Sequence, residues 1–75
     1  MAKKNTKGTG PVYEVHYRSL GKWRMKEVRG LRQAKMEAAR LSSSVRYGKK
    51  ARVEDPRNDD HWDYANGIIT YRSRR

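Results

Sequence analysis

The chain has 75 residues, of which 19 are Lys or Arg and eight are Asp or Glu, so its formal net charge is +11. A chain of this length forms one small domain that buries only about 60% of its unfolded surface. It contains no cysteine, which excludes disulfides and Cys-based zinc sites. No apolar run reaches the roughly 18 residues of a membrane span, and the N-terminus lacks the apolar middle of a signal peptide. We therefore expect a cytoplasmic protein with no membrane partner.

The distribution of large apolar side chains divides the sequence into three parts. Residues 1–11 hold three Lys, two Gly and one Pro, with Met1 as the only large apolar residue, and they predict a flexible basic arm. Residues 12–72 hold the other large apolar side chains and predict a single domain. Residues 73–75 predict a short basic tail.

The first predicted elements form a β-hairpin. Residues 12–18 alternate in polarity with Tyr13, Val15 and Tyr17 on one side, as a half-buried strand does. Residues 22–26 alternate in the same way, with Trp23 and Met25 on the apolar side, and the intervening Gly21 favours a tight connection. The outer face of this hairpin is then predicted to be a basic patch made of His16, Arg18, Lys22, Arg24 and Lys26.

A helix is predicted next, from residue 31 to residue 47, with Gly48 at its C-terminal end. Its apolar positions recur with helical spacing: Leu31, Ala34, Ala38, Leu41 and Val45. No Ser, Thr, Asp or Asn stands at the N-cap position before Leu31. One flank combines basic and small residues and fits the approach of a phosphate strand: Arg32, Lys35, Ala39, Ser43 and Arg46. An ordinary solvated face is the alternative interpretation.

The last third of the sequence predicts three strands. Residues 51–54 form a short strand that ends at Asp55-Pro56. Asn66-Gly67 predicts a two-residue type I′ turn between residues 61–65 and 68–72. The cross-strand pairs expected from this turn are Tyr64 with Ile69, Trp62 with Tyr71, Asp63 with Thr70, and His61 with Arg72.

These elements together predict the α+β class. We expect a small two-layer domain in which one antiparallel sheet packs on one helix, in the order β-β-α-β-β-β. The predicted sheet contribution to the core is Tyr13, Val15, Tyr17, Trp23, Met25, Val53, Trp62, Tyr64, Ile69 and Tyr71.

Five of the eight acidic residues fall within residues 54–63, which leaves the rest of the chain strongly positive. This loop either moderates self-repulsion, points away from a bound polyanion, or contacts a basic protein. His61 and Asp63 carry donor groups suited to a weak divalent-ion site, but a solvated loop explains them, and no metal or other cofactor is predicted. No catalytic triad, Cys/His pair or glycine-rich phosphate loop is recognisable, so the sequence does not predict an enzyme.

The excess of cations favours a small basic nucleic-acid-binding protein. DNA is favoured over RNA, because neither the aromatic signature of an RRM nor a KH-type GxxG is present. A β-ribbon can enter the major groove of DNA, where Arg18 and Arg24 are candidates for contacts with guanine edges. The predicted nucleic-acid contacts are Arg18, Lys22, Arg24, Lys26, Arg32, Lys35, Ser43, Arg46, Lys49 and Lys50.

The sheet-plus-helix layout of residues 13–47, about half of the chain, resembles the arm-type DNA-binding domains of phage integrases. This resemblance implies a sheet that lies in the major groove. The alternative function is a small accessory protein, such as one encoded by a phage, that binds and modulates a host protein through residues 54–63 or a sheet edge. The sequence leaves the oligomeric state and the order of the strands open.

Overall fold

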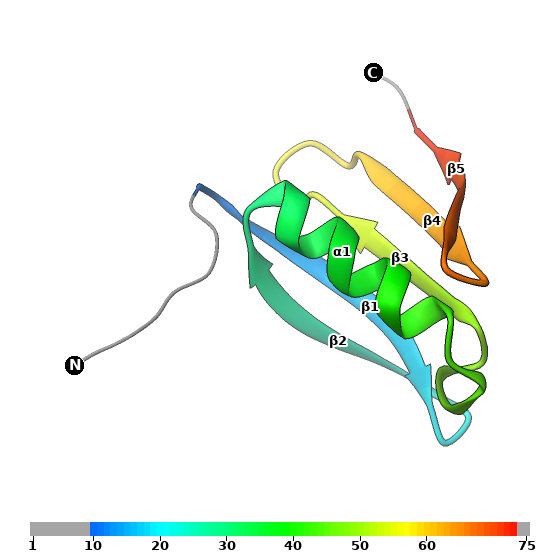
Figure 1. The fold of residues 1–75 in the computed structure, drawn as a ribbon. Coiled ribbons are helices and arrows are strands. Elements are labelled where there is room, and N and C mark those ends of the chain that lie inside the picture. The colour runs from blue at the N-terminus through cyan, green and yellow to red at the C-terminus, as the bar shows by residue number, and fades with distance from the viewer. Residues whose placement is uncertain (1–9, 74–75) are drawn as a thin grey trace.

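The computed structural model describes residues 10–73 and contains a five-stranded sheet with one α-helix. The elements are β1 (Val12–Ser19), β2 (Lys22–Arg29), α1 (Leu31–Ser42), the 3-10 turn η1 (Val45–Tyr47), β3 (Lys50–Glu54), β4 (His61–Ala65) and β5 (Ile68–Arg72). All neighbouring strands are antiparallel, in the order β2-β1-β3-β4-β5, and α1 lies across one face of the sheet (Figure 1). The predicted two-layer α+β architecture and element order are confirmed.

Parts of the predicted arm and tail lie outside the described residues, namely 1–9 and 74–75. The described end of the arm contacts the end of β2. Arg29 donates a hydrogen bond to the Gly10 carbonyl (3.0 Å), and the Gly30 amide donates one to the Pro11 carbonyl (2.8 Å). At the other terminus, Ser73 exchanges two hydrogen bonds with the backbone of His61.

The core lies between α1 and the face of the sheet that α1 covers, which we call the covered face. Val15 and Val53 pair across β1 and β3, and both are completely buried. Ala34 and Ala38 of α1 are also fully buried, and their small side chains permit close contact between the helix and the strands. Larger residues complete the core: Tyr13, Leu41, Trp62 and Tyr64. Tyr17 packs against it while remaining partly exposed.

The register of the β1–β2 hairpin differs from the prediction. Its turn consists of two residues, Leu20-Gly21, with φ values of 56° and 77°. This turn pairs Ser19 with Lys22 and Arg18 with Trp23. Because directly paired residues of antiparallel strands point to the same face, the short turn fixes the face of every side chain on β2.

The predicted core positions on β2 are therefore wrong. Trp23 and Met25 lie on the face opposite α1, which we call the open face, and they are 57% and 47% exposed. The predicted basic patch of the hairpin is divided between the faces: His16 and Arg18 lie on the open face, while Lys22, Arg24 and Lys26 lie on the covered side. Arg18 and Arg24 therefore lie on opposite faces of the hairpin and cannot contact one groove from the same surface.

The β4–β5 hairpin confirms the Asn66-Gly67 turn and the pairing of Tyr64 with Ile69. A β-bulge then shifts the ladder, because Thr70 has no direct partner. The three other predicted pairs are wrong, since Asp63 pairs with Tyr71 and Trp62 pairs with Arg72. Neither Ile69 nor Tyr71 is a core residue. Ile69 is 44% exposed because β5 is the outermost strand, and Tyr71 is 56% exposed because the bulge pairs it with Asp63 on the open face.

The α-helix ends at Ser42, five residues before the predicted end. Ser44 is extended and separates α1 from η1, and Gly48, with φ of 70°, follows η1 instead of α1. Val45 is consequently 78% exposed and outside the core. The buried Ser42 hydroxyl accepts a hydrogen bond from the Gly67 amide (3.0 Å) and so connects the end of α1 to the β4–β5 turn. As expected, no side chain caps the start of α1, where Gly30 is the N-cap residue.

Candidate nucleic-acid interface

Positively and negatively charged side chains gather at opposite ends of the strands. One end of the sheet carries the β1–β2 turn, the η1–β3 connection and the β4–β5 turn (Figure 1). Residues 18–23, 45–50 and 65–68, which form this end, contain no carboxylate. We call it the basic end, and its cationic side chains are Arg18, Lys22, Arg46, Lys49 and Lys50.

The opposite end of the sheet, where β3 leads into the loop before β4, carries most of the negative charge. We call it the acidic end, and its carboxylates are Glu14, Glu27, Glu54, Asp55, Asp59 and Asp60. The two remaining acidic residues, Glu37 and Asp63, lie in the middle of α1 and of β4. The arrangement gives the domain a charge asymmetry along its strands, which orients it in the field of a polyanion.

Backbone contacts between distant segments assemble the basic end. Tyr17 pairs with Ala51, and Arg18 and Lys50 are the next residues of β1 and β3 toward this end. Gly48 lies against Arg18, since a Cβ atom at position 48 would lie 3.8 Å from the Arg18 Cβ. The β4–β5 turn joins the same region through a hydrogen bond from the Asn66 amide to the Lys49 carbonyl (3.2 Å).

The cations of the basic end are not neutralised within the protein. None of the five makes an ion pair with any other side chain among residues 10–73. Four cations elsewhere in these residues do make ion pairs, whereas Arg24, Arg29, Arg32, Lys35 and Arg72 do not. Arg52 pairs with Asp63 (2.6 Å), and Arg57 pairs with the buried Asp55 (3.0 Å). Free cationic side chains beside one another repel, and an anionic polymer relieves that repulsion.

Glu37 of α1 is the centre of an ion-pair network. Its carboxylate accepts hydrogen bonds from Arg40 (2.6 Å) and Lys26 (2.7 Å). The Arg40 hydrogen bond, together with Lys26, lowers the Glu37 pKa from 4.5 to about 2 although partial burial opposes the shift. Lys26, a predicted nucleic-acid contact, is therefore engaged in the fold.

The predicted basic flank of the helix is also not a continuous stripe. The Lys35 ammonium lies over the Trp62 ring at 5.3 Å from its centre, and the Ser43 hydroxyl donates to the Arg40 carbonyl (2.8 Å). Arg32 lies in the first turn of α1, away from the basic end, whereas Arg46 lies beyond the end of the helix. Of the ten predicted contact residues, the structure brings five together in the basic end. Arg24 adjoins this end on the covered side of β2, and Ser43 lies against Gly67 of the β4–β5 turn. Lys26, Arg32 and Lys35 lie away from it.

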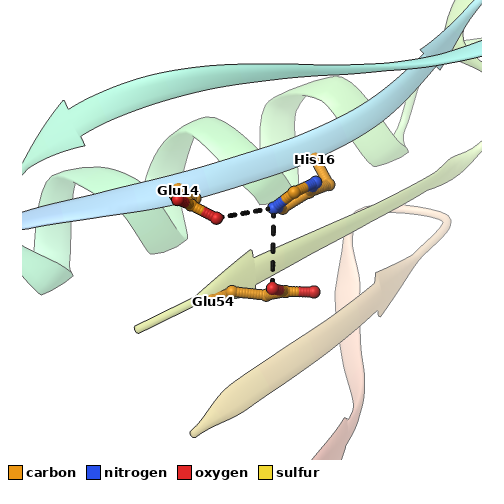
Figure 2. A group of neighbouring side chains, drawn as sticks. All are labelled: Glu14, His16 and Glu54. Carbon is orange, nitrogen blue, oxygen red and sulfur yellow. Dashed lines mark hydrogen bonds and ion pairs between the residues drawn. The ribbon is translucent and has the colours of Figure 1, made fainter. Parts of the chain in front are cut away.

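His16 lies between two carboxylates on the open face. Its Nε2 atom is 3.1 Å from Glu14 Oε1 and 3.7 Å from Glu54 Oε1, as Figure 2 shows. The three ligand atoms lie within 4.8 Å of one another, which is the donor set of a divalent-cation site. The same contacts also hold the three side chains together without an ion, since His16 is hydrogen-bonded to Glu14. His16 therefore belongs with the acidic groups, whereas the sequence places it in a basic patch.

One carboxylate of residues 54–63, which we call the acidic loop, stabilises the conformation of the loop itself. Asp55 is 5% exposed and accepts hydrogen bonds from the backbone amide and the guanidinium of Arg57, both at 3.0 Å. The loop is closed by a hydrogen bond from the Asp55 amide to the Asp60 carbonyl (2.8 Å). Asp55 is thus a structural residue, and the loop offers less free negative charge than its sequence suggests.

A hollow of about 490 Å³ lies on the open face and is lined by residues from all five strands. Trp23 forms one side of it and Thr70 contributes from the opposite edge of the sheet, with Lys50, Arg52 and Asp63 between them. Sequence reasoning missed this feature because it placed Trp23 in the core. The signal that could have found it is the two-residue spacing of Leu20-Gly21, which puts Trp23 opposite Arg18.

No family model, no curated protein and no solved structure matches this chain. Within residues 10–73, no helix has the length and apolar character needed to cross a membrane.

Proposed function

We propose that this protein binds nucleic acid through its basic end. The observation that carries the proposal is the separation of charge along the sheet, with five cations that make no ion pair within residues 10–73 at one end and six carboxylates at the other. Cationic side chains on loops and strand ends bind phosphates without regard to sequence, and such contacts provide most of the affinity of non-specific binding. The acidic end then faces away from the polymer and fixes the direction of approach.

The proposed binding surface differs from the surface predicted from the sequence. Binding does not require a β-ribbon inserted in a groove, because the cations lie at the tips of strands and in the connection before β3. Their positions allow the domain to approach a phosphate backbone with the turns first. A preference for DNA over RNA and a cytoplasmic location remain predictions, as does the absence of enzymatic activity.

The test is fluorescence anisotropy with labelled oligonucleotides over a salt series. The full chain is expected to bind with micromolar affinity at about 50 mM salt and to lose affinity steeply as salt increases. The triple substitution Lys22→Gln, Lys49→Gln and Lys50→Gln should weaken binding at least tenfold and lower the salt slope by about 2–3, because each lost phosphate contact removes roughly 0.7–0.9 from the slope.

A matched variant controls for the loss of net charge. Arg29→Gln, Arg32→Gln and Arg72→Gln also remove three cations, but from exposed positions outside the basic end. This control should bind within about threefold of the wild type, since it leaves the proposed contacts intact. Equal weakening by both triple variants would show that net charge matters and the basic end does not.

A second candidate, binding to a protein partner at a sheet edge, is favoured by β5. All five residues of this edge strand are exposed, and they include Ile68, Ile69 and Tyr71. An apolar edge strand is a surface to which another strand can add. Absence of oligonucleotide binding at 50 mM salt would remove the first function and leave this edge as the candidate surface.

A further inference from the structure

We infer that the hollow beside Trp23 holds an unpaired nucleobase, so that the ligand of this protein is a single-stranded nucleic acid. The inference rests on the proposed function and names its substrate class. The proposed nucleobase site lies on the open face of the sheet, whereas the phosphate contacts lie at the basic end, so the two parts can be tested separately.

The exposure of Trp23 is the first observation. A tryptophan offers a large flat surface, and Trp23 is 57% exposed on a rigid antiparallel sheet instead of contributing to the core. The guanidinium carbon of Arg18 lies 5.8 Å from the centre of its ring. An exposed aromatic ring beside cationic side chains is the combination on which unpaired bases stack.

The charge balance of the hollow is the second observation. Lys50 and Arg52 contribute two positive charges to its lining, and Glu54 and Asp63 contribute two negative charges. Arg52 and Asp63 are also paired with each other at 2.6 Å. A lining whose formal charges cancel is poorly suited to a phosphate, but it offers donors and acceptors to the edge of a neutral heterocycle.

The position of the hollow relative to the basic end is the third observation. Lys50 belongs to both, and Trp23 pairs directly with Arg18 of the basic end. A strand that places one base against Trp23 therefore has its neighbouring phosphates next to Arg18 and Lys50. A base inside a duplex is stacked on both faces and paired along one edge and cannot enter, so the geometry selects a single strand.

The experiment uses the full chain with three ligands of equal length: oligo-dT, oligo-U and a DNA duplex. Trp23→Ala should weaken binding of the single strands by about 5- to 100-fold through loss of base stacking, and should change duplex binding less than twofold. The salt slope should stay at the wild-type value, because no phosphate contact is removed. Met25→Ala is the matched control, since Met25 lies on the same face outside the hollow. The affinity of this variant should stay within twofold of the wild type.

Intrinsic fluorescence gives an independent readout. Trp62 is buried and Trp23 is exposed, so the oligo-dT-dependent quenching should disappear in Trp23→Phe, while this variant retains most of the affinity of the wild type. Similar affinities for oligo-dT and oligo-U would support stacking of the base as the main contact, because the two ligands differ in the 2′-hydroxyl and in the thymine methyl group but not in the heterocycle that stacks.

Two outcomes separate the failure of this inference from that of the proposed function. If Trp23→Ala binds single strands as the wild type does while the basic-end triple variant does not, the nucleobase site is wrong and the proposed function stands. If the wild type binds none of the three ligands at 50 mM salt, both are wrong.

Discussion

The two faces of the sheet each carry one tryptophan, and the two residues have opposite environments. Trp62 on the covered face is 7% exposed, packs edge-on against Tyr13 at 6.4 Å and lies below the Lys35 ammonium. Trp23 on the open face is 57% exposed and forms one side of a hollow. Because both lie in alternating sequences of similar polarity, the comparison shows that the register of a short turn decides which apolar residues stabilise the fold and which remain available for a ligand.

The largest effect should come from removing the tryptophan of the covered face. Trp62→Ala is expected to lower the free energy of unfolding by about 3–5 kcal/mol, because it leaves a cavity in the core of a small domain. Trp23→Ala should lower it by less than about 0.5 kcal/mol, as is usual for an exposed side chain. Urea denaturation measures both values, and similar losses in the two variants would contradict the assignment of the faces.

A smaller effect is expected at the contact between α1 and the β4–β5 turn. Ser42→Ala removes the acceptor of the Gly67 amide and should lower the free energy of unfolding by about 1–3 kcal/mol, since a partly buried donor is left without its partner. Ser43→Ala is the control, because Ser43 is exposed and bonds only to its own helix. Thermal melts that show equal losses for the two serines would disprove the connecting role of Ser42.

The ion pairs of Glu37 should produce a stability effect that depends on pH. The folded-state pKa of Glu37 lies at about 2, below the ordinary value of 4.5, so its contribution is complete above pH 4.5 and is lost as the pH falls toward 2. Glu37→Gln should lower the free energy of unfolding by about 1 kcal/mol at pH 7 and reduce the acid dependence in that window.

Glu27→Gln is the matched control for this prediction, because Glu27 is exposed and makes no ion pair within residues 10–73. It should leave the acid dependence of the melting temperature as in the wild type. An unchanged acid profile in Glu37→Gln would mean that the network on α1 does not stabilise the domain.

The smallest expected effect is a gain in stability from a substitution in the β1–β2 turn, next to Trp23 in the sequence. Leu20 has a φ of 56° and is 90% exposed, so it occupies a left-handed turn position without packing against the core. Leu20→Asn creates the Asn-Gly pair that this turn geometry favours and should raise the free energy of unfolding by about 0.5–1 kcal/mol. A loss of stability in this variant would mean that Leu20 makes contacts that its exposure does not show.

Local sequence patterns were sufficient to predict the elements and their class. The alternation of residues 12–18, the apolar spacing from Leu31 to Leu41 and the Asn66-Gly67 turn each correspond to an element of the structure. These signals are reliable because each depends on backbone geometry within a few residues.

The errors arose where tertiary contacts decide the outcome. The Leu20-Gly21 turn contains a leucine in a conformation that leucine rarely adopts, so Gly21 was the only residue that favoured a two-residue turn. The sequence pattern gave no signal for the bulge in the β4–β5 ladder, and the Ser42 hydroxyl at the end of α1 accepts its hydrogen bond from the distant Gly67 amide. The five cations of the basic end were all among the predicted contacts, but the sequence did not show that they form one surface, because they come from two connections that meet only in the folded sheet.

The most direct test is a titration of the ¹⁵N-labelled full chain with a short single-stranded oligonucleotide, followed by amide chemical-shift changes. We expect the largest changes at residues 18–23 and 46–52, with smaller changes at residues 31–40 and 54–60. Changes concentrated on α1 or the acidic loop, with none at the basic end, would contradict this expectation.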